Sequence, residues 1–410
     1  MSTMLICRLM VVTVVCLGLM SCVKDQPVTP NAQVVAVGGL FSITGNWNTL
    51  GKAGNAAAEL AVIDANAYFV SIGSTTRVTY QNYDTKLDTA IALEGMKYMQ
   101  GHQVRLVVGP QSSAEVSAIK PYADSAGILV ISPSSTAGAL AIANDNILRM
   151  CPSDAAEGPA IAAMMKAEGR TNIIPLWRDD IGNNGLKTST SAALVAGGAT
   201  VQPGMSYAPD VADFTSLVNN LRAMVSAQIA VSGNEKVAIY NPGFDEVANL
   251  FAAIPADDSV LRGVRWYGGD GTAMSAALLS QADFIAQVSY PNPLFGVGDG
   301  AAIAGSVAER IEARSGIDAD AYSLSVYDAV RIAATSYPLA SHIGTIAAVR
   351  EAFILEAAST FGVTGWTKLN EFGDREFGNF DMMAVRIVGG SPAWVRVGTY
   401  SASSGTYKPE

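Results

Sequence analysis

A short apolar run followed by a loop rich in hydroxyl side chains occurs twice between Leu106 and Thr136. The first copy reads LVVGPQSS (residues 106–113) and the second ILVISPSST (residues 128–136), with a helix-length stretch between them. In an α/β fold, this order brings both loops to the carboxyl ends of neighbouring parallel strands, where a small anion can bind. The doubled pattern therefore predicts a cleft that binds a small molecule.

Apolar strands alternate with helices over most of the chain. Strands are predicted at residues 34–40, 78–83, 106–108, 128–131, 146–150, 172–177, 237–240 and 264–267, with helices between them. Residues 178–185 are predicted to be a turn, with the next helix beginning at Leu186. Continuous apolar strands alternating with helices indicate parallel sheets covered on both faces. Two such runs of about 120 residues each predict two α/β lobes whose strand-end loops face one cleft.

Composition limits the classes of function. The 410 residues are half apolar, enough to bury one or two sizeable cores, and the formal charge is −10. An acidic chain with scattered Lys and Arg does not favour nucleic acid as a partner, because nucleic acid needs a basic surface.

The N-terminus has the features of a secretory signal. The run from Leu9 to Met20 is largely apolar, follows Arg8, and is too short to span a bilayer; a single-pass anchor is the alternative. It ends in Ser21-Cys22, which resembles a bacterial lipobox. That resemblance implies a signal peptide at 1–22, lipidation of Cys22, and an extracytoplasmic protein anchored to a membrane. Residues 23–33 are polar and predicted to be a tether.

The remaining cysteine gives no sign of a redox or metal site. Once the predicted signal is removed and Cys22 is lipidated, Cys151 stands alone, so no disulfide can form within the mature chain. No CxxC pair suggests zinc. We expect Cys151 to be a small buried residue, and we expect no cofactor and no metal.

Several short phrases together resemble one family. They are SITG at 42–45, NYDT at 82–85, VVGP with Ser112-Ser113, ISP with Thr136, RMCPSD at 149–154, YDA at 327–329, FGVTG at 361–365 and FGDR at 372–375. In order and spacing they resemble the type I periplasmic binding proteins of the branched-chain amino acid class, the substrate receptors of ABC importers. The resemblance implies the periplasmic binding protein-like I fold: two doubly wound lobes joined by a three-segment hinge that can close on a ligand. Lobe 1 would be 33–152 plus 292–362, and lobe 2 would be 153–291 plus 363–410.

The resemblance also implies how an amino acid would be held. The carboxylate-binding serine of the family falls on Ser113, and its second hydroxyl and a backbone contact fall on Thr136 and Ser134. A structural role competes for the neighbouring serine, because SSAE at 112–115 fits a capping box with Ser112 as the N-cap. Asp270 follows the strand at 264–267, where the family often places an acid over the ligand ammonium; an Asx turn is the alternative.

The side-chain end of the predicted site is less defined. Trp47, in the loop after the first strand, is expected to wall an apolar side chain or simply to pack. Where many relatives carry aromatic residues in the second lobe, this chain has Ile181 and Phe244. These residues leave the nature of the ligand's side chain open.

The sequence therefore predicts a membrane-anchored binding lipoprotein that captures an amino acid or similar small carboxylate and delivers it to an ABC permease. A ligand-sensing receptor of the same fold is the alternative. A hydrolase is a remote alternative, because only His102 and His342 could serve a catalytic triad. The segment 179–185 only faintly resembles a calcium loop, since it lacks the later bidentate glutamate. We expect no enzymatic activity.

Overall fold

The structure is a computed structural model that describes residues 33–297 and 302–410. The predicted signal peptide at 1–22, the lipidation site Cys22 and the predicted tether up to residue 32 lie outside the described residues. Residues Val34–Glu410 form one compact unit by their contacts.

The first sheet, sheet A, is parallel throughout. Its strands are β1 (Val34–Phe41), β2 (Arg77–Asp84), β3 (Leu106–Val108), β4 (Leu129–Ser132) and β5 (Ile147–Arg149), in the order β2-β1-β3-β4-β5. Apolar side chains point to both faces: Leu106 and Val108 belong to one buried cluster and Val107 to another. The sheet therefore needs helices on both sides.

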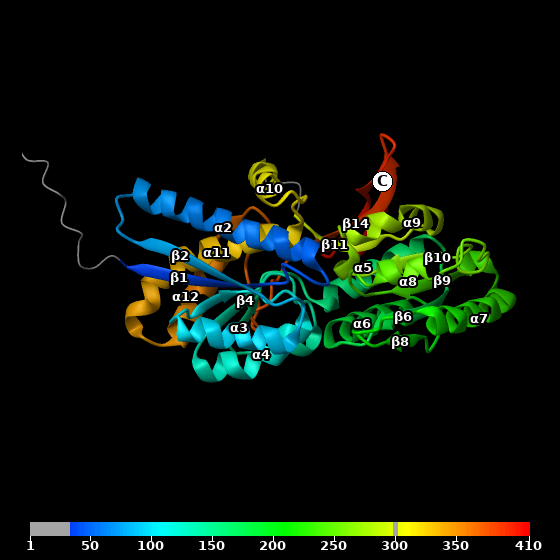
Figure 1. The fold of residues 1–410 in the computed structure, drawn as a ribbon, viewed down its shortest axis with the longest axis horizontal. Coiled ribbons are helices and arrows are strands. Elements are labelled where there is room, and N and C mark those ends of the chain that lie inside the picture. Colours follow the sequence, from blue (N-terminus) through cyan, green and yellow to red (C-terminus); the bar gives the residue numbers. More distant parts are fainter. Residues whose placement is uncertain (1–32, 298–301) are drawn as a thin grey trace, which may run out of the picture. The chain divides into compact units, whose positions relative to one another are not determined.

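Helices from two separate parts of the chain cover sheet A (Figure 1). One face packs against α2 (Asn48–Ser71), α10 (Ala302–Ser315), α11 (Ala321–Ala340) and α12 (Ile346–Ser359). The other face packs against α3 (Thr89–Gly101) and α4 (Ser113–Ala126). Three of the covering helices follow the second sheet in sequence, so this lobe is discontinuous in the chain.

The second sheet, sheet B, is also parallel. Its strands are β6 (Asn172–Arg178), β7 (Thr200–Val201), β9 (Val237–Asn241) and β10 (Arg265–Gly268), in the order β10-β9-β6-β7, with β8 (Met205–Tyr207) also paired to β6. Helices α5 (Asp154–Ala167) and α6 (Ile181–Ala196) cover one face. Helices α7 (Thr215–Ser232), α8 (Val247–Ala252) and α9 (Ala282–Val288) cover the other. The predicted α/β class with two parallel-sheet lobes is confirmed.

An antiparallel sheet that the sequence analysis did not predict joins the second lobe. It is formed by β11 (Asn292–Gly296), β14 (Asn379–Val388), β15 (Ser391–Ser401) and β16 (Thr406–Pro409). Phe380, Met382 and Tyr400 from its strands pack in the same cluster as α5 and α6. A separate two-stranded hairpin consists of β12 (Phe361–Gly362) and β13 (Gly365–Trp366).

The chain passes between the two parallel sheets three times: after β5, between β10 and α10, and between β13 and β14. A buried ion pair links the first and third passages, with Arg149 Nε 2.5 Å and Nη2 2.6 Å from the carboxylate oxygens of Asp374. The residue boundaries of the two lobes remain a prediction.

Candidate functional site

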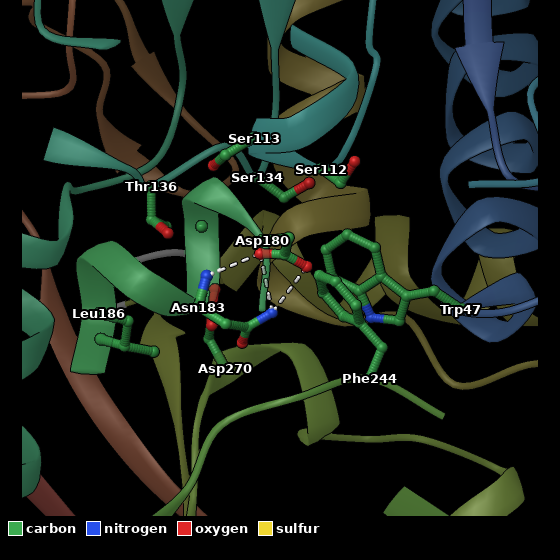
Figure 2. Close-up of a pocket in the computed structure, with 11 residues that line it drawn as sticks. Trp47, Ser112, Ser113, Ser134, Thr136, Asp180, Asn183, Leu186, Phe244 and Asp270 are labelled. Atoms are coloured by element: carbon green, nitrogen blue, oxygen red, sulfur yellow. Dashed lines mark hydrogen bonds between the residues drawn. The ribbon is translucent and has the colours of Figure 1, made fainter. Parts of the chain in front are cut away.

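Loops at the carboxyl ends of both sheets line one cavity (Figure 2). From sheet A come residues that follow β1, β3 and β4, and from sheet B come residues that follow β6, β9 and β10. The lining residues are Trp47, Ser112, Ser113, Ser134, Thr136, Asp180, Gly182, Asn183, Leu186, Phe244 and Asp270. Six of the seven predicted ligand residues are thus brought together from loops far apart in the sequence.

Ile181, the seventh predicted ligand residue, does not line this cavity. It lies in an adjacent open groove together with Gly138, Ala139, Asp154, Ala155, Asp180, Asn184, Gly185, Thr188 and Ser189. The predicted turn before Leu186 was wrong in its extent, because α6 begins at Ile181. Asp180 is its N-cap and accepts from the backbone N–H of Asn183 at 2.9 Å, which starts the helix despite the Gly and Asn residues that follow.

The cavity is nearly closed in this conformation. Its free volume is about 20 Å³, which is room for about one water molecule. An amino acid does not fit this space in the conformation that the structure describes.

Hydroxyl groups and a helix N-terminus form one side of the cavity. The predicted capping box is confirmed: the Ser112 hydroxyl accepts from the Glu115 N–H at 3.2 Å and donates to the Glu115 carboxylate at 2.6 Å. This cap fixes Ser113 as the first residue of α4. The Ser113 hydroxyl accepts from the Ala137 N–H at 3.2 Å and shares a hydrogen bond with Ser135 at 3.0 Å.

Ser134 and Thr136 contribute differently to that side. The Ser134 hydroxyl donates to the carbonyl oxygen of Gln111 at 3.0 Å, so its proton is already used within the protein. The Thr136 hydroxyl lies near the Asp154 carboxylate, and in Figure 2 it lies beside the open space. Backbone groups of Ser134 and the hydroxyl of Thr136 are the parts of this loop that suit a ligand.

Asp270 supplies an acid from the opposite side. It begins a short 3-10 helix after β10, and one of its carboxylate oxygens accepts from the N–H of the next residue, Gly271, at 2.8 Å, which is not the bond of an Asx turn. The other oxygen accepts from the Tyr322 hydroxyl at 2.7 Å, which comes from α11. Burial raises the pKa of Asp270 to about 6, partly offset by the Tyr322 hydrogen bond, so the carboxylate is mostly ionised at pH 7.

A second acid in the cavity is neutralised by the protein itself. Asp180 accepts from Arg178 Nε at 2.8 Å and from the side-chain amide of Asn183 at 3.1 Å. Arg178 also lies 3.5 Å from Glu246. Asp180 was not predicted as a site residue, although an acid at the start of a helix after a strand is a signal that could have marked it.

Aromatic residues from the two sides meet at one end of the cavity. The rings of Trp47 and Phe244 lie 4.5 Å apart between centroids, at an angle of 38°. Beside them, the Asn46 side-chain amide donates to Glu246 at 2.7 Å, and its oxygen accepts from the Asp245 N–H at 3.0 Å. These contacts hold the two sides together at one end of the cavity.

A third acid, Asp154, lies beside the cavity without a hydrogen-bond partner. It is the first residue of α5, its side chain is buried, and neither carboxylate oxygen makes a hydrogen bond of acceptable geometry. Burial raises its pKa to about 7; the nearby Thr136 hydroxyl lowers it in part and the charge of Asp270 raises it further. Asp154 belongs to the RMCPSD phrase, but sequence reasoning gave it no role.

Glu157, one helical turn further along α5, is the buried neighbour of these acids. One of its oxygens accepts from the Asp270 N–H at 3.2 Å, and the other has no partner. Burial and the nearby charges of Asp270 and Asp154 raise its pKa. The protein thus places three acids close together in a largely buried region.

The residues that a hydrolase would need lie elsewhere. His102 ends α3, with its Nδ1 2.8 Å from the carbonyl oxygen of Tyr98, and His342 lies in a 3-10 helix after α11. Cys151 is buried, as expected. Within residues 33–297 and 302–410, no group of His, Cys, Asp and Glu side chains is arranged to hold a metal ion. No helix in that part of the chain is both long and apolar enough to cross a membrane.

Comparison with known proteins gives a consistent result. A sequence profile of the family described as periplasmic binding protein matches residues 34–387. An uncharacterized protein of Methanocaldococcus jannaschii is 30% identical over 410 aligned residues, which cover 94% of this chain and 95% of that protein.

Solved structures share the fold at lower identity. LivJ of Streptococcus pneumoniae, a branched-chain amino acid transporter substrate binding protein in complex with isoleucine, has a TM-score of 0.68 and 20% identity, over 89% of this chain and 99% of that one. The leucine binding protein LivK of Thermotoga maritima has a TM-score of 0.69 and 16% identity, over 90% and 99%. A solute binding protein of an R. palustris ABC transporter, in complex with benzoate, has a TM-score of 0.68 and 17% identity, over 88% and 96%.

Proposed function

This chain belongs to the periplasmic binding protein family, and on that premise we propose that it binds an amino acid, or a similar small carboxylate, between its two lobes. We further propose that it is an extracytoplasmic lipoprotein, anchored through Cys22, that delivers this ligand to an ABC permease. Lobe 1 would be residues 33–152 plus 292–362, and lobe 2 residues 153–291 plus 363–410.

The observation that carries the proposal is the opposite chemistry of the two sides of the cavity. Ser113 and Thr136 present hydroxyls at the N-terminus of α4, where the helix dipole favours an anion by about 0.3–1 kcal/mol. Asp270 faces them from the other sheet as an acceptor for a cation. A ligand with a carboxylate and an ammonium on neighbouring atoms matches that arrangement, and each charge would gain a partner on burial.

The relatives support a carboxylate-bearing ligand. Two proteins of the same fold are in complex with isoleucine and with benzoate, which share a carboxylate and differ in the rest of the molecule. We propose that Ser113, Thr136 and the backbone at Ser134 receive this carboxylate, and that Asp270 receives the ammonium. Trp47 and Phe244 would separate to admit the ligand's side chain, with Ile181 at the rim of the adjacent groove.

Calorimetry on residues 23–410, which contain the whole compact unit, tests the binding proposal. Amino acids and simple carboxylates are titrated into the wild type, Ser113→Ala and Asp270→Asn. Loss of a charge-assisted hydrogen bond of about 1.5–3 kcal/mol weakens binding at least tenfold. Matched controls are Ser125→Ala, an exposed serine on the same helix, and Asp283→Asn, an exposed acid on α9. Amino acids that bind equally well to wild type and Asp270→Asn would exclude the ammonium role.

Membrane anchoring is tested separately by cell fractionation. The full chain is expected in the membrane fraction with a lipid label, and Cys22→Ser is expected to abolish the label. A Cys22→Ser variant that keeps its lipid label would exclude lipidation at this position.

A further inference from the structure

We infer that the ligand carries a second cationic group, and that Asp154 receives it in the groove beside the cavity. The inference rests on the proposed function, since it assumes that the carboxylate and first ammonium bind as described. It narrows the ligand class to a basic amino acid, with an alkylammonium side chain.

Asp154 is a buried carboxylate without an ion-pair partner within the described part of the chain. It is 2% exposed and lines the groove, and neither carboxylate oxygen makes a hydrogen bond of good geometry; the neighbouring donors are the Thr136 hydroxyl and the Gly138 N–H. A buried charge without a partner is costly, and native proteins rarely keep one without a reason. A ligand ammonium entering the groove could donate to both oxygens.

Among the residues that the structure describes, the cation whose charge acts on Asp154 is already paired elsewhere. This cation, Arg149, donates through Nε and Nη2 to Asp374 and through Nη1 to the carbonyl oxygens of Ser135 and Ala137. None of the side chains that line the cavity or the groove is Lys, Arg or His. Two further acids, Glu157 and Asp270, lie near enough to Asp154 for their negative charges to act on it.

The acids line two different spaces. Asp270 lines the cavity, Asp154 lines the groove, and Asp180, which lines both, is already paired with Arg178. A zwitterion with an apolar side chain neutralises Asp270 and adds its own carboxylate, which leaves Asp154 unpaired. A ligand with a second ammonium would pair with Asp154 as well.

A glycine keeps the space next to Asp154 open. Gly185 lies inside α6, where glycine costs about 1 kcal/mol relative to alanine. A Cβ atom at this position would lie 2.7 Å from Asp154 Oδ2, too close for the carboxylate to stay in place. The rest of the groove is lined mainly by small or apolar residues, including Ala139, Ala155 and Ile181, which suit an alkyl chain.

Matched pairs of amino acids test the inference on residues 23–410. Lysine is compared with norleucine and ornithine with norvaline, because each pair has the same chain and differs by the terminal ammonium. The basic member of at least one pair should bind wild type about 10- to 100-fold more tightly, the range for one charge-assisted hydrogen bond. Asp154→Asn should remove that advantage and leave the binding of norleucine and norvaline within about threefold.

Two glycine variants supply a second test that keeps the carboxylate. Gly185→Ala should also remove the advantage of the basic ligand, because its methyl group displaces the Asp154 side chain. Gly138→Ala is the control in the same groove: its Cβ would meet nothing within 4 Å, so binding of both members of a pair should be unchanged.

The outcomes separate this inference from the proposed function. Wild type that binds norleucine and norvaline as tightly as lysine and ornithine would overturn the inference and leave the function intact. So would an Asp154→Asn variant that weakens both members of a pair equally, because Asp154 would then serve the ammonium that all amino acids share. If no amino acid or simple carboxylate binds, the proposed function itself fails.

Discussion

Asp154→Asn is expected to stabilise the ligand-free protein at pH 8 and to flatten the dependence of its stability on pH. The folded protein holds the Asp154 carboxyl in a buried position beside Asp270 and Glu157, which raises its pKa from the usual 3.8 to about 7. Ionising this carboxyl is therefore harder in the folded chain than in the unfolded chain.

The sign and size of the effect follow from these two values. Below pH 3.8 both states are protonated, and the group has no effect on stability. As pH rises towards 7, the unfolded chain loses its proton first, so the free energy of unfolding falls by about 1.4 kcal/mol per pH unit. Over the whole pH range between the two pKa values, the free energy of unfolding falls by about 4 kcal/mol. Between pH 5 and pH 8 it falls by about 2–3 kcal/mol.

Urea unfolding of ligand-free wild type and Asp154→Asn at pH 5, 6.5 and 8 measures this difference. Wild type should lose stability as pH rises. The variant should lose about 2–3 kcal/mol less between pH 5 and pH 8, and should be the more stable of the two at pH 8. A residual slope is expected, because the raised pKa values of Asp270 and Asp320 act in the same direction.

The control is Asp210→Asn, an exposed acid in the loop before α7, which should leave the pH profile unchanged. An Asp154→Asn profile parallel to that of wild type would mean that Asp154 is neither buried nor unpaired in solution, and the argument built on it would fail.

Three further substitutions test other parts of the structure. Gly182→Ala places a Cβ 3.4 Å from Ser113 Cβ across the cavity, so calorimetry should show amino acid binding at least about tenfold weaker. The thermal midpoint should not fall, because alanine favours the helix. Unchanged affinity would contradict the placement of the carboxylate. Ser112→Ala removes the cap of α4 and should lower the free energy of unfolding in urea by about 1–2 kcal/mol. Arg149→Met leaves Asp374 buried and unpaired and should cost about 3–5 kcal/mol, most of it recovered in the double variant with Asp374→Leu; a double variant no better than the single would contradict the pairing.

The fold was largely predictable where strands are buried on both faces. Strands such as β3 and β4 are short, nearly continuous apolar runs, and their alternation with helix-length segments indicates a parallel sheet. The antiparallel sheet was not predicted, because β14 and β15 are half exposed and mix polar with apolar residues. The start of α6 was misplaced because its first turn depends on the Asp180 cap, while Gly and Asn dominate its composition.

The site was predictable to the extent that it follows from strand ends. Ser113, Thr136 and Asp270 lie after strands, and the topology of an α/β sheet brings such positions to one edge. The importance of Asp154 could not be read from the sequence. It depends on Arg149, five residues earlier, being bound instead to Asp374, which lies 225 residues further along the chain.

The coverage of sheet A by α11 and α12 has a consequence for the order in which the protein is made. Residues 34–149 supply the five strands and helix α2, but the face that holds Val35 and Leu106 is fully covered only after residues 321–359 have been synthesised. The helices and strands of sheet B are encoded between them, in residues 154–288, almost without interruption. One face of sheet A therefore stays incompletely covered until late in translation, whereas the middle of the chain can cover both faces of its parallel sheet earlier.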